Sequence, residues 1–197
     1  MTVRRRWWVQ AWTMVAAGLL SVAVTPSHAV GQGPPEVVAE RFFHHLGRLE
    51  WQELSGVLHP AVLADFDLIA HQLVASSRGD AVLAELYDVP LSTLEGWSDA
   101  VTFARSMAGL TQYARGLMES QVMTDVELLG KVNEGDRVSH VLYREVTDHM
   151  GVQTDGVSVL SLELAPEGWR VTANAELEVL KTAFRGIPIA REPPPDP

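Results

Sequence analysis

The spacing of apolar residues changes once along this chain, and that change limits the folds it can adopt. Between residues 36 and 117, apolar residues recur every three or four positions, which is the spacing of one helix face. From residue 122 onward they alternate with polar residues, which is typical of half-buried β-strands. A chain whose helices precede its strands is expected to fold as α+β, with helices on one face of a curved antiparallel sheet.

The helical part is expected to contain several helices. A linker over residues 30–35 ends in two prolines, and proline suits the first turn of a helix. His59-Pro60 should end a short second helix, because the residue before a proline avoids the helical region. Ser92 and Glu95 form a capping box that opens a longer helix toward Leu117. The apolar stripe of the first helix, which starts at Glu36, consists of Val38, Phe42, Leu46 and Leu49.

The second part is expected to form about four strands in sequence, over residues 122–132, 138–147, 157–164 and 169–173. Turn-forming residues separate them at 133–136 and 166–168, and a longer connection is predicted over 148–156. A last helix is expected over about 175–185. The proline-rich tail at 187–197 is expected to be disordered.

The first 29 residues are predicted to be an export signal. Three arginines at positions 4–6 precede an uncharged apolar run, and small residues at Ser27 and Ala29 fit cleavage after Ala29. A cut after Ala23, an uncleaved N-terminal membrane anchor and either of two export routes remain alternatives. We therefore expect an exported protein, periplasmic or secreted, whose mature chain begins at residue 30.

Charge and cysteine content exclude several classes of function. The chain has 15 Lys and Arg, 25 Asp and Glu, and no Cys. Without the three N-terminal arginines, the chain has 12 positive and 25 negative groups, which gives a net charge of −13. Nucleic acids and anionic membranes both repel such a surface, and a chain without cysteine has no disulfide and no thiolate metal site. We expect no nucleic-acid partner, and no membrane partner after signal cleavage.

Several segments resemble the nuclear-transport-factor-like (ketosteroid-isomerase-like, cystatin-like) superfamily. They are LEWQELSGVLHP at 49–60, VELLGKVNEGD at 126–136, VLYR at 141–144, and VLSL at 159–162 followed by GWR at 168–170. The resemblance covers about residues 35–185. These segments mark turns and core positions, so they concern the fold and not an activity.

The resemblance implies a cone: a curved sheet wraps a long helix, with a pocket at the open end, and dimers form through the sheet. Its members include isomerases, cyclases, dehydratases, transport factors and binding modules without catalysis, so the fold alone does not decide the function. The implied domain spans residues 36–186. The helical stretch at 61–119 departs from the compact pattern and is interpreted as an insertion that forms a lid or fills the cone.

Histidine spacing gives little support for a metal site. His44 and His45 are adjacent on the first predicted helix, where successive side chains diverge by about 100°, so they are not expected to chelate one ion together. Glu40 shares a face with His44, but Glu36 continues that line as a solvated stripe. No paired-histidine zinc motif and no Gly-rich phosphate loop occur in the sequence. We therefore expect no metal and no cofactor.

The second predicted strand supplies the main candidates for a pocket. Val138, His140, Leu142, Arg144 and Val146 share one face, with three apolar members of five, and this face is predicted to be concave. His140 could then exchange a proton, and Arg144 could hold a carboxylate or an enolate. The alternative is that both groups pair with sheet neighbours or with helix carboxylates such as Asp65 or Asp67.

Asp65, Asp67 and Asp99 lie among apolar residues in the helical part, and Asp65 is included among the pocket candidates. Surface exposure or helix capping is the alternative for each. With no catalytic motif in the sequence, the predicted function is non-catalytic binding of a small apolar molecule or a protein partner. The alternative is a cofactor-free acid–base enzyme, such as an isomerase, cyclase or dehydratase, with a pocket on the concave face. A homodimer through the sheet is a further expectation.

Overall fold

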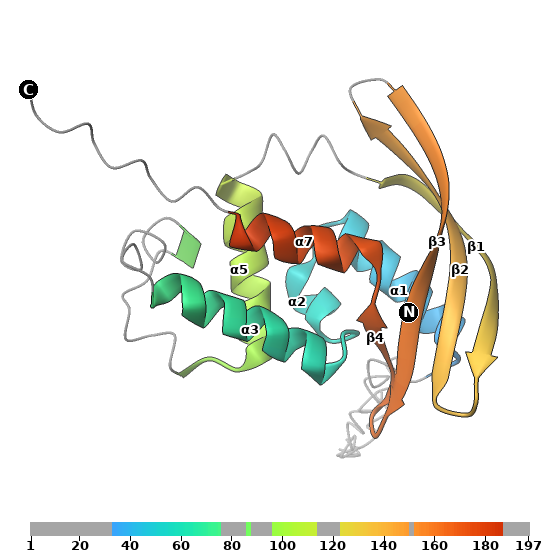
Figure 1. The fold of residues 1–197 in the computed structure, drawn as a ribbon, viewed down its shortest axis with the longest axis horizontal. Coiled ribbons are helices and arrows are strands. Elements are labelled where there is room, and N and C mark those ends of the chain that lie inside the picture. The colour runs from blue at the N-terminus through green and yellow to red at the C-terminus, as the bar shows by residue number, and fades with distance from the viewer. Residues whose placement is uncertain (1–32, 76–85, 88–95, 114–122, 150–151, 187–197) are drawn as a thin grey trace, which may run out of the picture.

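The computed structural model describes residues 33–75, 86–87, 96–113, 123–149 and 152–186 (Figure 1). The helices are α1 (Pro35–Gly47), α2 (Trp51–Ser55), α3 (Pro60–Val74), α5 (Asp99–Tyr113) and α7 (Ala175–Arg185). The strands are β1 (Met123–Glu134), β2 (Val138–His149), β3 (Val152–Ala165) and β4 (Gly168–Ala173). None of the helices in these ranges is long and apolar enough to span a membrane. The predicted signal, the capping box and the tail lie outside the described residues.

Helix α1 begins close to the predicted residue and buries most of its predicted stripe, but it ends at Gly47, before Leu49. Pro35 occupies the first turn, where a missing N–H costs nothing, and Glu36 adds a favourable negative charge there. Val38, Phe42 and Leu46 are buried, as expected from their spacing. Leu49 lies beyond the end of the helix and is only partly buried. The stripe is wider than predicted, because Phe43 is buried as well.

Helices α2, α3 and α5 pack together on the side of the molecule away from the sheet (Figure 1). The rings of Phe66 in α3 and Phe103 in α5 meet edge to face, with centroids 4.9 Å apart. Gly109 in α5 lies against the backbone of Leu86, so a Cβ at this position would lie 2.1 Å from the Leu86 carbonyl oxygen. Gly109 is therefore needed for this close packing, because any side chain would collide with the Leu86 backbone.

The four strands form one antiparallel sheet in the order β1-β2-β3-β4, which confirms the predicted meander. The connection predicted over 148–156 is wrong in extent. Strand β2 continues to His149 and β3 begins at Val152, and the two pair from Val138↔Glu163 to His149↔Val152. The alternating apolar pattern is weak over this stretch, but the hairpin ladder extends through it.

Strand β1 changes its inward face midway. The pairing register with β2 shifts between Leu128 and Gly130, and Gly130 has a φ of +151°, which favours glycine. Leu128 is therefore opposite buried Tyr143, whereas Val132 is opposite His140 and is 59% exposed. Strand β1 therefore does not present the same alternating face to the core along its whole length.

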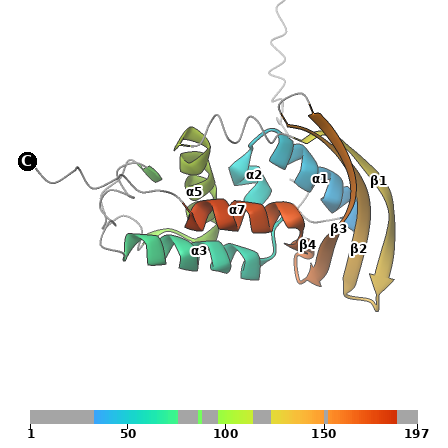
Figure 2. The same cartoon turned by 45° about the horizontal axis from the view of Figure 1, so that its top comes forward.

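The sheet curves around the helices, and the described helices all lie on its concave side (Figure 2). Helix α1 crosses that side, and α7 returns from β4 to pack Leu177, Leu180 and Phe184 into the core. Asn174 caps α7, because its Oδ1 accepts the N–H of Leu177 at 2.9 Å. The protein is thus α+β, with N-terminal helices packed against a four-stranded antiparallel sheet and a C-terminal helix.

Candidate functional site

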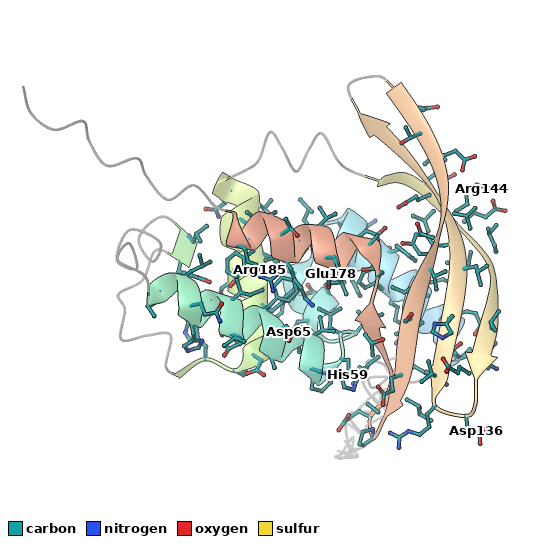
Figure 3. All side chains as sticks on the ribbon, in the orientation of Figure 1. His59, Asp65, Asp136, Arg144, Glu178 and Arg185 are labelled. Carbon is teal, nitrogen blue, oxygen red and sulfur yellow. The ribbon has the colours of Figure 1, made fainter. Side chains whose placement is uncertain are left out.

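The predicted pocket residues of β2 lie on the opposite face of the sheet from the one expected. Ser139, Val141 and Tyr143 are buried on the concave side, while Arg144 is exposed and points outward (Figure 3). His140 shares the outer face with Arg144, because residues two apart in a strand point the same way. The predicted orientation of this strand is therefore wrong. Counting apolar residues misled because the outer face carries three of them, Val138, Leu142 and Val146, whereas the buried face carries only Val141 and Tyr143.

His140, Leu142 and Arg144 interact with neighbours in the sheet. The ring of His140 lies 3.0 Å from Ser161 Oγ and 3.2 Å from Glu134 Oε2. Arg144 Nη1 donates to Glu127 Oε2 at 3.0 Å, and its Nε lies 3.7 Å from Asp155. Leu142 is half-buried opposite Val159. These contacts match the alternative in which both polar groups pair within the sheet.

Asp65 lies in the helical part, far from Arg144 (Figure 3). Its carboxylate is exposed and accepts a hydrogen bond of 2.9 Å from Lys181 Nζ in α7. Burial by itself would lower the pKa of Lys181, but the hydrogen bonds that Lys181 donates to Asp65 and Glu178 outweigh it and raise the pKa. Asp65 therefore ties α3 to α7, and the structure does not bring it together with His140 or Arg144.

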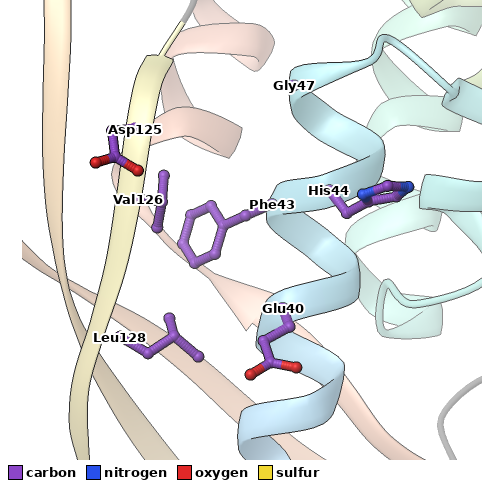
Figure 4. Close-up of a pocket in the computed structure, with 7 residues that line it drawn as sticks. All are labelled: Glu40, Phe43, His44, Gly47, Asp125, Val126 and Leu128. Carbon is purple, nitrogen blue, oxygen red and sulfur yellow. The ribbon is translucent and has the colours of Figure 1, made fainter.

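A groove between α1 and β1 has a volume of about 470 Å³ and is open to solvent. It is lined by Glu40, Phe43, His44 and Gly47 from α1 and by Asp125, Val126 and Leu128 from β1. The side chains of Phe43, Val126 and Leu128 point toward one another across the groove (Figure 4). His44 and Asp125 point away from its centre, so they form its edges.

The groove has an apolar floor with one carboxylate beside it. Phe43 is buried beneath the groove, and Val126 and Leu128 are half-buried in its wall. The carboxylate of Glu40 lies at one end, between the helix and the strand (Figure 4). Such a surface can bind a small molecule with an apolar body, because apolar contact supplies affinity and a few polar groups set the orientation.

A polar cluster lies behind the groove, on the concave side of β2. The ring of Phe43 contacts that of Tyr143, with centroids 4.5 Å apart. The hydroxyl of Tyr143 donates to both carboxylate oxygens of Glu176, at 2.8 and 2.9 Å. Asn174 also donates to Glu176, and Ser158 Oγ donates to Glu145 at 3.3 Å. These groups fasten the start of α7 to the sheet.

Burial and charge change the acidity of this polar cluster. Burial raises the pKa of Glu176, and the neighbouring Glu145 carboxyl adds to the rise, while hydrogen bonds from the Glu176 N–H and from Tyr143 oppose it. Burial also raises the pKa of Tyr143, and the nearby Glu176 carboxylate raises it further. Glu176 therefore holds its proton to a higher pH than a solvent-exposed glutamate does.

Three potential metal ligands meet at the C-terminal end of α1. A ring nitrogen of His44, a ring nitrogen of His45 and a carboxylate oxygen of Glu50 all lie within 4.8 Å of one another. The two imidazole rings meet edge to face, with centroids 5.4 Å apart. The divergence of the two side chains from the helix, on which the sequence prediction relied, does not keep the rings apart.

The sequence signals for these sites were present but ambiguous. Phe43 is adjacent to the predicted stripe residue Phe42, and a wider stripe would have included it. The pairing of Tyr143 with Glu176 joins residues 33 positions apart, and no local pattern predicts it. Glu50 reaches His45 only because the chain turns back after α1.

Comparisons with known proteins give no relative for this chain: no protein-family model, no curated protein and no solved structure matches it.

Proposed function

We propose that the chain is an exported binding module that holds a small, mainly apolar molecule in the groove between α1 and β1. The observation that carries this proposal is the groove itself, a space of about 470 Å³ with Phe43, Val126 and Leu128 as its floor and wall. That volume falls within the range of about 300–1,000 Å³ common for ligand sites. Glu40 at one end of the groove would accept a hydrogen bond from a donor group on the ligand.

Family and compartment belong to the same proposal. The order of helices and sheet, and the curvature of the sheet around α1, support a nuclear-transport-factor-like module of the non-catalytic kind. The basic and then apolar N-terminal segment supports export. Expression in a bacterial host with intact export, followed by mass measurement of the secreted chain, should give a protein that begins at Val30. A full-length mass in the membrane fraction would support the anchor instead.

A neutral fluorescent probe, N-phenyl-1-naphthylamine, tests the groove. We expect its fluorescence to rise on binding the wild-type protein, because the groove shields it from water. Val126→Glu places a carboxylate in the apolar wall and should weaken binding at least about tenfold, equivalent to roughly 1.4 kcal/mol. Leu129→Glu is the matched control. Leu129 lies on the same strand, its side chain is 43% exposed, and it does not line the groove.

Equal weakening by both variants would place the probe elsewhere and contradict the proposal. Retention of full affinity by Val126→Glu would do the same. Circular dichroism melting curves for both variants serve as a check that the sheet is intact. A selective loss with Val126→Glu and an unchanged melting curve is the expected result.

The acid–base alternative relies on Glu176 and Tyr143. These residues supply a proton-holding carboxyl and a hydroxyl on the concave face. Tyr143 donates to Glu176, Glu176 also accepts from Asn174, and none of the three lines the groove. We therefore rank binding ahead of catalysis.

A second candidate function, association with a second copy of this chain, is favoured by the outer face of the sheet. Val132, Val157 and Val159 are 59%, 59% and 46% exposed there, and Leu142 lies beside Val159. Charged neighbours on this face are already paired, Arg144 with Glu127 and His140 with Glu134. These pairs lower the charge repulsion that a second copy would meet at this face, although the chain as a whole is acidic.

Sedimentation velocity over a range of protein concentrations tests this association. We expect the wild-type protein to dimerise and Val159→Glu to remain monomeric at the same concentrations. Val179→Glu is the matched control, because Val179 is a 54%-exposed valine on α7, away from the sheet face. A monomeric wild-type protein, or equal disruption by both variants, would contradict a dimer through the sheet.

A further inference from the structure

A corner at the end of α1 brings two histidines and one glutamate together. We call His44, His45 and Glu50 the histidine corner; their ligand atoms lie within 4.8 Å of one another. His45 Nδ1 already lies 2.8 Å from Glu50 Oε2. The two side chains are partly exposed, at 20% and 35%, and His44 is more exposed still. Solvent and ions can therefore reach all three groups.

We propose that the histidine corner binds a divalent transition-metal ion of the Zn²⁺ or Cu²⁺ class. Two imidazoles and one carboxylate are the donor set that such ions accept in proteins, and three protein ligands leave coordination positions open for water or an external ligand. This site is separate from the apolar floor of the groove, because the ring of His44 points away from the groove centre (Figure 4).

The backbone turns directly after α1 and brings Glu50 back beside the end of that helix. The N–H of Glu50 donates to the carbonyl of His45 at 2.9 Å, and the N–H of Leu49 donates to that of Leu46 at 3.1 Å. These two bonds form the usual closing turn of a helix that ends in a left-handed residue. The turn places the Glu50 carboxylate beside the His45 ring.

The left-handed residue in this turn is Leu49, with a φ of +57°, and among the described residues it is the sole non-glycine with positive φ. Glycine is the usual residue at this position, because a Cβ is strained there. Strained backbone that the surrounding structure maintains is concentrated at functional sites. Partial burial of Leu49 against the core holds the strained turn, and with it Glu50, in place.

The electrostatics of the corner also favour a cation. The carbonyl end of α1 carries partial negative charge, and the chain as a whole is strongly acidic. The carboxylate of Glu50, whose Oε2 lies 2.8 Å from His45 Nδ1, adds a negative group to the corner. Arg48 Nη1 lies 3.8 Å from the other Glu50 oxygen, but its side chain is 65% exposed and can move into solvent.

Metal binding requires one adjustment. Ligand atoms on a single Zn²⁺ lie about 2.0–2.2 Å from the ion, so no two can be more than about 4.4 Å apart. His45 and Glu50 already satisfy that limit. The exposed ring of His44 then needs only a side-chain rotation, which local packing does not oppose.

The test is titration of the untagged full-length chain with Zn²⁺ by calorimetry, and with Cu²⁺ by electron paramagnetic resonance. We expect one Zn²⁺ per chain with a Kd at or below about 10 µM. His44→Ala and Glu50→Gln should each weaken binding at least about tenfold. The Cu²⁺ spectrum should report two nitrogen ligands in the wild-type protein and one in His44→Ala. Because His44 is exposed, this variant is expected to fold normally.

His71→Ala and His140→Ala are the matched controls. Each of these histidines pairs with one carboxylate, Asp67 at 3.1 Å and Glu134 at 3.2 Å, and neither belongs to a three-ligand cluster within the described residues. Both variants should bind Zn²⁺ as the wild-type protein does. Absence of Zn²⁺ binding below about 100 µM, or an affinity unchanged by His44→Ala, overturns the proposal. Glu50 does not line the groove and Val126 does not belong to the histidine corner, so Glu50→Gln should leave probe binding unchanged and Val126→Glu should leave Zn²⁺ binding unchanged. The two proposals can therefore fail separately.

Discussion

The two faces of the sheet carry similar apolar residues, but these residues are buried on one face and exposed on the other. On the concave face, Val141, Leu160 and Leu162 are fully buried beneath the helices. On the outer face, the neighbouring residues Val157 and Val159 are about half exposed. Apolar side chains therefore contribute to folding on one face and remain available for association on the other. The difference depends on which face the helices cover and not on the residues themselves.

The largest effect expected from this contrast is on core packing. Leu160→Ala should lower the free energy of unfolding by about 2–5 kcal/mol, because it leaves a cavity beneath the helices. Val159→Ala, one residue away on the outer face, should lower it by less than about 1 kcal/mol. Urea unfolding at low protein concentration measures both without a contribution from association. Equal losses would mean that the outer face is also packed in the monomer.

A smaller effect is expected for the polar cluster. Tyr143→Phe removes the hydroxyl that bonds Glu176 and should cost about 1–2 kcal/mol, because a half-buried carboxyl loses a donor. Arg144→Ala removes an exposed ion pair on the outer face and should cost no more than about 0.5 kcal/mol. Thermal unfolding of the two variants provides the measurement. A larger loss for Arg144→Ala would reverse the assigned roles of the two faces.

The smallest effect is a change in how stability depends on pH. Glu176 has a raised pKa, so its contribution to stability is fully present below the ordinary value of 4.5 and is lost as pH rises through the raised pKa. Glu36 has a lowered pKa because of its hydrogen bond from Lys131, so its contribution is present above 4.5 and is lost as pH falls through the lowered pKa.

Glu176→Gln should therefore flatten the decline in stability above pH 4.5, and Glu36→Gln should flatten the decline below it. Urea midpoints measured across the acidic and neutral range distinguish the two slopes. The effect of Glu36→Gln should stay below about 1 kcal/mol, because the ion pair with Lys131 is exposed. A finding that both substitutions flatten the same part of the stability-versus-pH curve would contradict the burial of Glu176.

The sequence predicted the fold class well because each element carries its own local signal. The stripe of α1, the alternation in the strands and the glycines in the turns depend on neighbours close in sequence. The inward face of β2 could not be predicted in the same way, since Val138, Leu142 and Val146 on one side compete with Val141 and Tyr143 on the other. Helices far away in sequence decide which side is covered.

The candidate sites were predicted less well for the same reason. His140, Leu142, Arg144 and Asp65 were chosen from alternation and composition, and the structure places them on the outer face of the sheet or between α3 and α7. The groove needs α1 and β1 side by side, although about 80 residues separate Phe43 from Val126. The histidine corner depends on a strained turn at Leu49. A leucine in the sequence does not predict the left-handed backbone that this turn requires.

The edges of the sheet decide how molecules of this protein can meet in a concentrated solution. On β4, the backbone of Val171 is already paired with Val57 and His59, so this edge is closed. On β1, the pairing shifts near Asp125 and again near Gly130, and an irregular strand is a poor template for adding another chain. Both edges are therefore poor templates for adding another strand, even though valines remain uncovered on the outer face.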